Sequence, residues 1–174
     1  MTFSGAFVKP FRPVFDPGLA AIALTQQPFL LDFATSYGSF GGDAANGREF
    51  QVAIDAMCYG LRVKLYGAQT CNIRLWRTDT ATQVAEELGL AAAVGTNLLL
   101  FSTPIAINSV LTYRISCARV GLPFNLGYYI ATSDHPDGPV TILSSNSYCW
   151  RASDAYPSNV VAGWSWACEP IIYA

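Results

Sequence analysis

Apolar and polar residues alternate with a period of two over much of the chain. In the stretch YGLRVKLYG, Leu61, Val63 and Leu65 fall on one side, and Arg62 and Lys64 fall on the other. Successive side chains of a β-strand point to opposite faces of a sheet, so this pattern predicts strands with one buried and one wetter face. The same alternation groups Phe50, Val52 and Ile54 on one face, sets Ile73 and Leu75 against Arg74 and Trp76, and sets Leu111, Tyr113, Ile115 and Cys117 against Thr112, Arg114 and Ser116.

Clusters of turn-forming residues separate these runs, at YGSFGGDAANG, YGAQ, RTDT, VGTN and SDHPDGP. Further strands are expected near PFLLDFA, LLLFS, GYYIAT, VTILS and WSWACEPIIYA, which gives about eight to ten short strands. Only TQVAEELGLAAA resembles a helix, and its two adjacent glutamates fit equally well on a strand and the loop after it. We therefore predict an all-β protein with an antiparallel β-sandwich (jelly roll) over residues 28–174.

Residues 1–27 form a segment rich in proline and glycine, which we predict to be an extended N-terminal arm. In FSGAFVKPFRPVF, Phe3, Phe7, Phe11 and Phe15 recur every fourth residue, but the prolines between them exclude a regular helix. Left in water, four phenylalanines would form an exposed apolar patch, which monomers avoid. The arm must therefore pack either on its own sandwich as an extra edge strand or on neighbouring subunits. We predict the second, with the four phenylalanines as partner-binding residues.

The composition is unusual in its low charge. Charged residues make up 13% of the chain and hydrophobic residues 52%, whereas a typical domain has about 25% charged residues. Charged residues are depleted where proteins contact one another, so the composition favours a homo-oligomer whose surface is partly covered by other subunits. A compact β-protein with a Ser/Thr/Asn surface is the alternative, and both interpretations stay open.

Charge and apolar runs also bear on partners and compartment. The net charge is −2 with no acidic or basic tail, so nothing predicts nucleic-acid binding. The longest apolar stretch, 88–101, is short and interrupted by glycine and asparagine, which predicts no membrane span, and the first residues lack the apolar run of a secretory signal. The five cysteines include no C-x-x-C pair and are expected to be reduced and buried. A disulfide between Cys149 and Cys168 is the alternative in an oxidising environment.

The sequence offers few groups for catalysis. His135 is the only histidine, and it lies in SDHPDGP, which we interpret as a surface turn over 134–138. A catalytic triad is assembled in space, so a serine close to His135 in sequence is weak evidence for one. Calcium binding by Asp134 and Asp137 would supply too few oxygens. Because the other carboxylates lie in different elements, we predict no catalytic residues, no metal and no cofactor.

Aromatic residues gather in the last third of the chain. Tyr129, Trp150, Trp164 and Trp166 are candidate glycan-binding residues, since exposed aromatic rings stack on sugars. Aromatic side chains of a sandwich also commonly pack in its core, so this alternative stays open. Four outward cations are either a basic stripe or part of a solvated face with scattered acids. They are Arg62, Lys64, Arg74 and Arg114.

The middle and end of the chain resemble a known family. The segments LRVKLYG, IRLWRTD, LLLFSTPIAIN, LTYRIS and YCWRASDAYPSNVVAGWSWACEPIIYA are similar to a jelly-roll domain of unknown function of bacterial secreted and surface proteins. The resemblance covers residues from about 47 to 174 and leaves the arm outside. It implies a carbohydrate-binding-module-like jelly roll, often placed beside carbohydrate-active or adhesive modules.

An apolar arm, few charges and an adhesive-type jelly roll together resemble a virus-particle component, such as a phage decoration, fibre or tail-appendage protein. We therefore expect a non-enzymatic structural protein, made in the host cytoplasm and located in the virion, which binds capsid or tail subunits through its arm. The alternative is a carbohydrate-binding module or adhesin, extracellular or at the cell surface, that uses the C-terminal aromatic residues on a host glycan. Fold alone does not decide between them.

Overall fold

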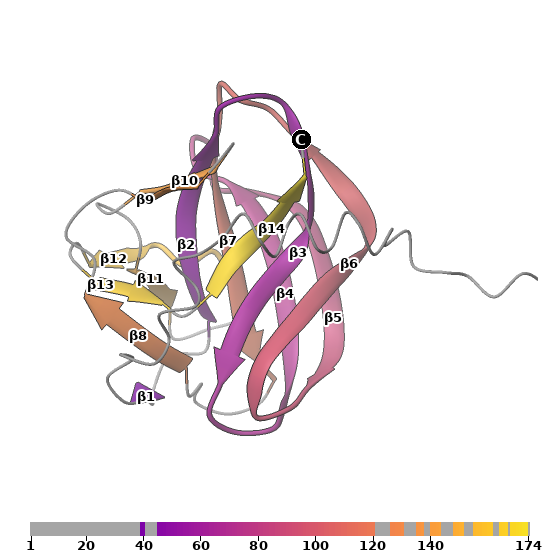
Figure 1. The fold of residues 1–174 in the computed structure, drawn as a ribbon, viewed down its shortest axis with the longest axis vertical. Helices are drawn as coiled ribbons and strands as arrows, with labels where there is room; N and C mark the ends of the chain where they lie inside the picture. The colour runs from indigo at the N-terminus through magenta and orange to yellow at the C-terminus, as the bar shows by residue number, and fades with distance from the viewer. Residues whose placement is uncertain are drawn as a thin grey trace, which may run out of the picture.

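The described part of the protein consists of β-strands joined by turns. The computed structural model describes residues 39–40, 45–120, 126–130, 135–137, 140–143, 148–151, 155–161, 164–166 and 168–173 (Figure 1). The strands are β1 (Ser39–Phe40), β2 (Ala45–Val52), β3 (Ala56–Leu65), β4 (Gln69–Arg77), β5 (Thr82–Ala92), β6 (Gly95–Ile107), β7 (Thr112–Arg119), β8 (Leu126–Ile130), β9 (His135–Asp137), β10 (Val140–Ile142), β11 (Tyr148–Arg151), β12 (Asn159–Val161), β13 (Trp164–Trp166) and β14 (Cys168–Tyr173).

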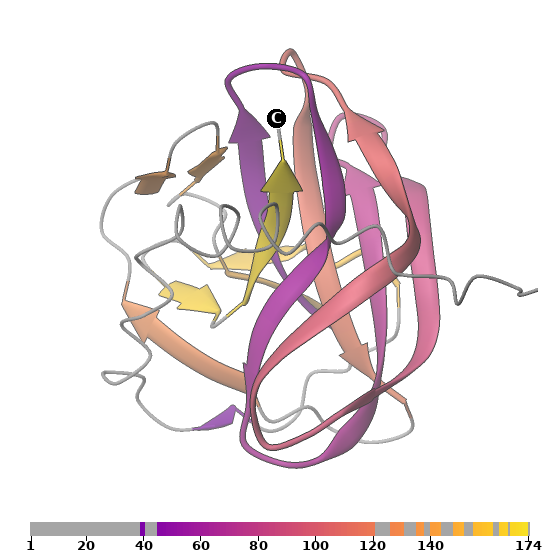
Figure 2. The ribbon, with the colours of Figure 1, turned by 45° about the vertical axis from the view of Figure 1, so that its right-hand side comes forward.

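Two antiparallel sheets pack face to face, which confirms the predicted all-β sandwich (Figures 1 and 2). In sheet A, β3 lies between β6 and β14, and β8 connects β3 to β1 and β13. In sheet B the strands follow the order β12-β11-β2-β7-β4-β5, and β10 pairs with both β2 and β9. The jelly-roll arrangement of the strands and the domain boundary at residue 28 stay predictions.

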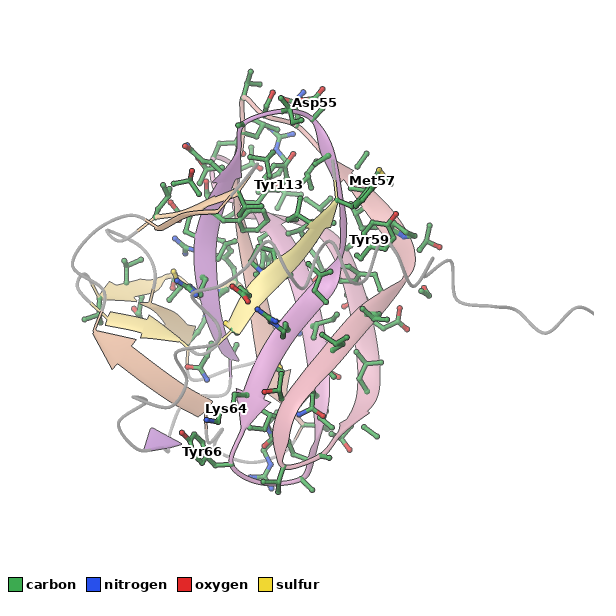
Figure 3. The ribbon with its side chains drawn as sticks, viewed as in Figure 1. Asp55, Met57, Tyr59, Lys64, Tyr66 and Tyr113 are labelled. Carbon is green, nitrogen blue, oxygen red and sulfur yellow. The ribbon has the colours of Figure 1, made fainter. Side chains whose placement is uncertain are left out.

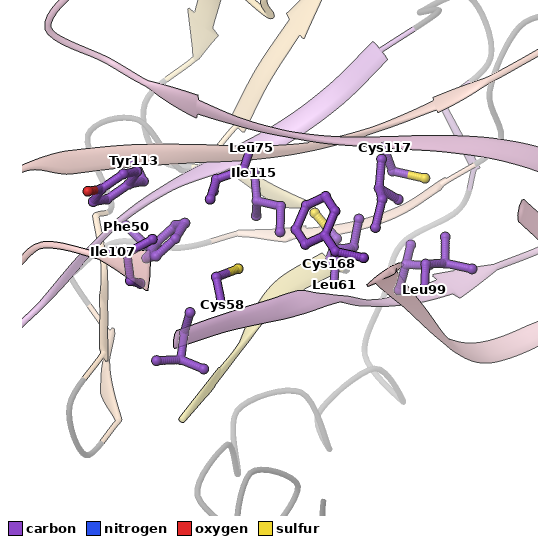
Figure 4. Packing of buried hydrophobic residues seen from close by; sticks show 14 of the residues in the cluster. Phe50, Cys58, Leu61, Leu75, Leu99, Ile107, Tyr113, Ile115, Cys117 and Cys168 are labelled. Atoms are coloured by element: carbon purple, nitrogen blue, oxygen red, sulfur yellow. The ribbon is translucent and has the colours of Figure 1, made fainter. Parts of the chain in front are cut away.

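The core lies between the sheets and has the composition that the alternation predicts (Figure 4). Each predicted apolar face of β3, β4 and β7 supplies buried residues, while the residues between them point outward. Ile54 is the exception: β2 ends at Val52, and Ile54 lies in the following turn with 57% of its surface exposed. The larger members of the core are Phe50, Leu61, Val63, Leu65, Ile73, Leu75, Leu99, Phe101, Ile107, Tyr113, Ile115 and Ile172.

The segment TQVAEELGLAAA is a strand, so its helical interpretation is wrong. It forms β5, which pairs with β4 from Thr82 to Ala92 and is the last strand of sheet B. Pairing with β4 satisfies the backbone polar groups along one side of this edge strand. Cross-strand contacts add to this, since Arg74 Nε donates to Glu86 Oε2 at 3.2 Å. The chain then turns into β6 and so passes from sheet B to sheet A.

Two predicted turns are partly strands. His135, Pro136 and Asp137 form β9, which pairs with β10, so the interpretation of these residues as a turn is wrong. The turn expected over YGSFGGDAANG ends early, because β2 begins at Ala45 and includes Gly47. A Cβ atom at Gly47 would lie 2.6 Å from the carbonyl oxygen of Ile115 on β7. This glycine therefore allows two strands to approach closely, and it does not mark a turn.

Candidate binding surfaces

An open pocket lies at one end of the sandwich, where the turn between β2 and β3 meets the turn between β6 and β7 (Figure 3). Its volume is about 410 Å³, within the range of sites that bind small molecules or single side chains. The walls are mostly apolar, with two polar residues at the rim. The lining residues are Asp55, Ala56, Met57, Ala106, Ile107, Asn108 and Tyr173.

Hydrogen bonds hold the rim of this pocket in place. Asp55 Oδ1 accepts bonds from the Ser109 backbone N–H at 2.8 Å and from its hydroxyl at 2.9 Å. Asn108 donates its backbone N–H to the Tyr113 hydroxyl at 2.9 Å, and its side-chain oxygen accepts the Val110 N–H at 2.8 Å. The bonds from Ser109 hold the pKa of Asp55 below its ordinary value of 3.8. The pocket therefore has a negatively charged group at its edge at neutral pH.

Two apolar side chains project into solvent beside this rim. Val110 is 85% exposed and follows the residue that bonds to Asp55, and Ile54 is 57% exposed and precedes Asp55. Single exposed apolar residues are ordinary, but here two of them flank, in sequence, the polar residues at the rim of a mostly apolar pocket. We call the pocket, Ile54 and Val110 together the pocket end. Sequence reasoning missed it, because the alternation assigned Ile54 to the core; only the Asn108–Ser109 pair gave a turn signal.

The outer face of sheet A includes the floor of the pocket and extends along the sheet. The registers of β3, β6 and β14 and the membership of the core define which residues face outward. This face is mixed, with aromatic and aliphatic residues around two cations and one carboxylate. We take the outer face of sheet A to be Met57, Tyr59, Arg62, Lys64, Leu98, Glu169, Ile171 and Tyr173.

Three residues in the middle of that outer face are buried. Glu169 is 0%, Ile171 4% and Arg62 6% exposed. Arg62 Nε donates to Glu169 Oε1 at 3.0 Å, and its NH2 group donates to the same oxygen. A buried ion pair is costly to desolvate, so it persists only where both charges are well matched. These three residues in the middle of the face are therefore inaccessible to water, whereas Leu98 at its side is 42% exposed.

The outer face of sheet B has a comparable buried pair, and here the covering residues are described. Arg114 donates to Glu49 Oε2 at 2.5 Å and to the Pro157 carbonyl at 2.5 Å. The Tyr156 ring lies 4.8 Å from the Arg114 guanidinium carbon and 5.6 Å, edge-on, from the Trp76 ring. Burial is the main cause that raises the pKa of Tyr156. The segment 155–158 therefore packs over sheet B and encloses the pair.

The structure does not form the basic stripe. Arg62 lies on sheet A with Glu169, whereas Arg74 and Arg114 lie on sheet B with Glu86 and Glu49. The fourth residue, Lys64, has its ammonium nitrogen 5.9 Å from the centre of the Tyr66 ring. The scattered-acid alternative describes these cations better, because each arginine has a carboxylate partner.

The register of the strands partly groups the candidate glycan-binding residues. In the β13–β8 ladder, Trp166 pairs with Tyr128 and Ser165 with Tyr129. Tyr129 is therefore in register with the serine and with neither tryptophan. Trp150 lies in sheet B, where it pairs with Asn46 and Asn159. The backbone thus brings Trp164 and Trp166 beside β8, while Trp150 belongs to another sheet.

Other predictions concern the arm, the thiols, metals and membranes. The four arm residues Phe3, Phe7, Phe11 and Phe15 lie outside the described residues.

All five cysteines are buried free thiols, and burial raises the pKa of Cys58, Cys149 and Cys168 to about 12 each. Among the described residues, no group of three or more His, Cys, Asp or Glu side chains could hold a metal ion. That same part of the chain has no helix long and apolar enough to cross a bilayer.

No protein-family model matches the chain, and no curated protein matches its sequence. Function is therefore argued from the surfaces described above.

Proposed function

We propose that this chain is a non-enzymatic structural protein of a bacteriophage or similar particle, which binds neighbouring subunits through its arm and its pocket end. The observation that best supports this is the pocket end itself: Val110 and Ile54 exposed beside an apolar pocket with a fixed rim. Burying each such side chain in an interface contributes about 1.5–3 kcal/mol before ordering costs. A rigid apolar surface of this kind is typical of a site that contacts another protein.

We further propose that the occupant of the pocket end is the arm of a second copy of this chain. The arm offers phenylalanines at regular intervals, with Lys9 and Arg12 among them. An aromatic side chain fits an apolar pocket of about 410 Å³, and a neighbouring cation would lie near the negative Asp55. An arm that passes from copy to copy would produce a homo-oligomer and would leave the rest of the sandwich for capsid or tail subunits.

Sedimentation velocity over a range of concentrations tests the pocket end. Val110→Asp, alone and with Ile54→Asp, should shift the self-association of the full-length protein to at least about tenfold higher concentration, because a charge replaces an apolar contact. Val120→Asp is the matched control, since Val120 is also exposed, at 53%, but follows the far end of β7. If all three variants associate as the native protein does, the pocket end is not the interface.

The genes beside the one that encodes this chain test the proposed class of protein. Capsid and tail genes on either side are the expected result. A neighbourhood of secreted carbohydrate-active enzymes, without particle genes, would contradict the virion proposal.

A carbohydrate-binding module is the second candidate. The observation in its favour is the β13–β8 ladder, which brings Trp164 and Trp166 beside Tyr128 and Tyr129. Such a row of aromatic residues is a common sugar-binding arrangement when the rings face solvent. A glycan array with the native protein and with Trp164→Ala tests it. Binding that Trp164→Ala abolishes would support a glycan site, and no binding by either protein would remove this candidate.

A further inference from the structure

Two buried thiols lie together on the inner face of sheet B. In the β4–β7 ladder Cys71 pairs with Arg119, and Ile73 pairs with Cys117. Cys71 and Cys117 are therefore diagonal neighbours, and both belong to the core between the sheets, where Figure 4 shows Cys117. Each is 0% exposed, and a hydrogen bond joins the two side chains. Two cysteines that are far apart in the sequence thus form one buried dithiol.

The surroundings of this dithiol favour the ionised form of a thiol. The hydrogen bond with Cys117 is the main cause that lowers the pKa of Cys71 below its ordinary value of 9.0, and the positive charge of Arg119 acts in the same direction. Burial instead raises the pKa of the other three cysteines to about 12 each. The thiolate is the form of cysteine that binds metal ions, so this pair differs from the other three in the property that a metal requires.

A polar side chain without a partner lies beside the dithiol. Asn46 is directly opposite Cys117 in the β2–β7 ladder and is 0% exposed. Among the described residues, neither the Nδ2 nor the Oδ1 atom of Asn46 has a hydrogen-bond partner. Directly opposite residues have Cβ atoms about 4.5–5.5 Å apart, so the amide lies close to the Cys117 thiol. An unpaired buried amide is costly, which indicates that it serves a group that it can bind.

We propose that Cys71 and Cys117 bind a soft monovalent metal ion, Cu(I), between their two thiolates, with Asn46 donating an N–H to the Cys117 sulfur. Each thiol releases one proton to solvent and forms one Cu–S bond, and copper keeps its oxidation state, so no oxidant is needed. The bound ion and two thiolates together carry one negative charge, which Arg119 offsets.

The number of ligands selects this metal. Thiolates are soft ligands that favour Cu(I), and Cu(I) is satisfied by two of them in a linear arrangement. Zinc takes four ligands in a structural site. In the part of the chain that the structure describes, no third His, Cys, Asp or Glu joins the pair. A site with two thiolates and no further ligand therefore suits Cu(I) and does not suit zinc.

The spacing of the strands favours a bridging ion over a disulfide between the same cysteines. Diagonal neighbours on adjacent strands lie about 7–8 Å apart, whereas the Cα atoms of a disulfide lie about 4.4–6.8 Å apart. Closing that difference would require β4 and β7 to shift, but the two strands pair continuously from Cys71 to Arg77. An ion between the sulfur atoms needs no such shift. This inference goes beyond the proposed function and does not depend on it.

Copper binding by the full-length protein tests the site. Because the thiols are buried, the reduced protein is refolded from urea without oxygen in the presence of Cu(I), so that the site can fill as the chain folds. A chelator that is specific for Cu(I) then removes loosely held metal, and elemental analysis gives the copper per chain. Cys71→Ala and Cys117→Ala are the test variants, and Cys58→Ala is the matched control, because Cys58 is another buried core thiol. Circular dichroism shows whether each variant folds.

We expect one copper per chain in the native protein and in Cys58→Ala, and none in Cys71→Ala or Cys117→Ala. Asn46→Ala should keep the copper but bind it about 10- to 100-fold more weakly, as expected when a group that orients a ligand is lost. X-ray absorption of the native protein should show two sulfur neighbours around copper, and this measurement decides even if an alanine variant does not fold.

Three results would overturn the proposal. They are a native protein that retains no copper, equal copper in Cys71→Ala and Cys58→Ala, and a copper ion with three or more neighbours. A disulfide between Cys71 and Cys117 in the protein refolded without copper, found by mass spectrometry of unreduced peptides, would also overturn it, since the two thiols would then be close enough to join directly.

Discussion

At the scale of single residues, one glycine carries a structural requirement that its sequence context does not show. Gly60 has a φ of 148° and lies at the irregularity where β3 shifts its register against β6. A Cβ atom there would lie 2.1 Å from the carbonyl oxygen of Leu99. That oxygen belongs to the backbone and cannot move aside cheaply. A glycine is therefore required at this point of sheet A.

Gly60→Ala should consequently lower the stability of the protein by about 3 kcal/mol or more, as expected for overpacking against backbone. The matched control is Gly67→Ala, since nothing lies within 4 Å of a Cβ atom at Gly67. Its effect should stay within about 0.5 kcal/mol. Urea unfolding of the three proteins measures both differences. Equal stability of the two variants would contradict the close approach of β3 and β6.

The charge of Asp55 at the pocket end makes the stability of the fold depend on pH. Its pKa in the folded protein is lowered, chiefly by the Ser109 backbone bond, so its ionised form stabilises the fold above the ordinary value of 3.8. That contribution is lost as the pH falls through the lowered pKa. Asp55→Asn should therefore melt at a lower temperature than the native protein at neutral pH, and the gap should shrink as the pH falls below 3.8 and through the lowered pKa. A gap of constant size would show that the Asp55 charge does not stabilise this turn.

At the scale of elements, the segment 155–158 covers part of the outer face of sheet B. The Pro157 carbonyl accepts a hydrogen bond from Arg114 on β7, and the Tyr156 ring contacts Trp76 on β4. The segment therefore contacts two neighbouring strands of the sheet. The period-two pattern correctly placed Arg114 and Trp76 on the outward face. It could not show that this face is buried, because Tyr156 lies 42 positions after Arg114 and 80 positions after Trp76 in the chain.

Removing one partner of this pair should be costly. Arg114→Met leaves Glu49 buried without its cation and should destabilise the protein by about 3–5 kcal/mol. The control is Arg77→Met, which breaks the exposed Arg77–Asp79 pair and should change the stability much less, because water screens this pair. Chemical denaturation measures both. If Arg114→Met costs no more than the control, the 155–158 segment does not enclose the pair.

The same scale shows why β5 was ambiguous in the sequence. Alanine, leucine and glutamate favour helices, and no local signal in TQVAEELGLAAA overrides that preference. The strand arises from β4, whose edge pairs along the whole of β5. A strand that is distant in sequence thus determines whether such a segment becomes a helix or a strand. In contrast, β3, β4 and β7 were predictable, because the residues that their alternation places on one face are the residues that pack in the core.

At the scale of the whole molecule, the sequence was sufficient for the fold class and not for the binding surface. Alternation predicts two-faced strands, and two-faced strands build a sandwich. The pocket end depends on two turns, after β2 and after β6, that meet only in the folded chain, so neither Asp55 nor Val110 differs in sequence from any turn residue. The low share of charged residues was the one global signal of covered surface.

The most direct test of the proposed function compares the full-length protein with a variant that lacks residues 1–18. Light scattering measures the mass in solution, and thermal melting measures stability at several protein concentrations. We expect the full-length protein to form oligomers whose melting temperature rises with concentration, and the shortened protein to be a monomer without that dependence. A full-length monomer whose stability is the same without residues 1–18 would contradict the account.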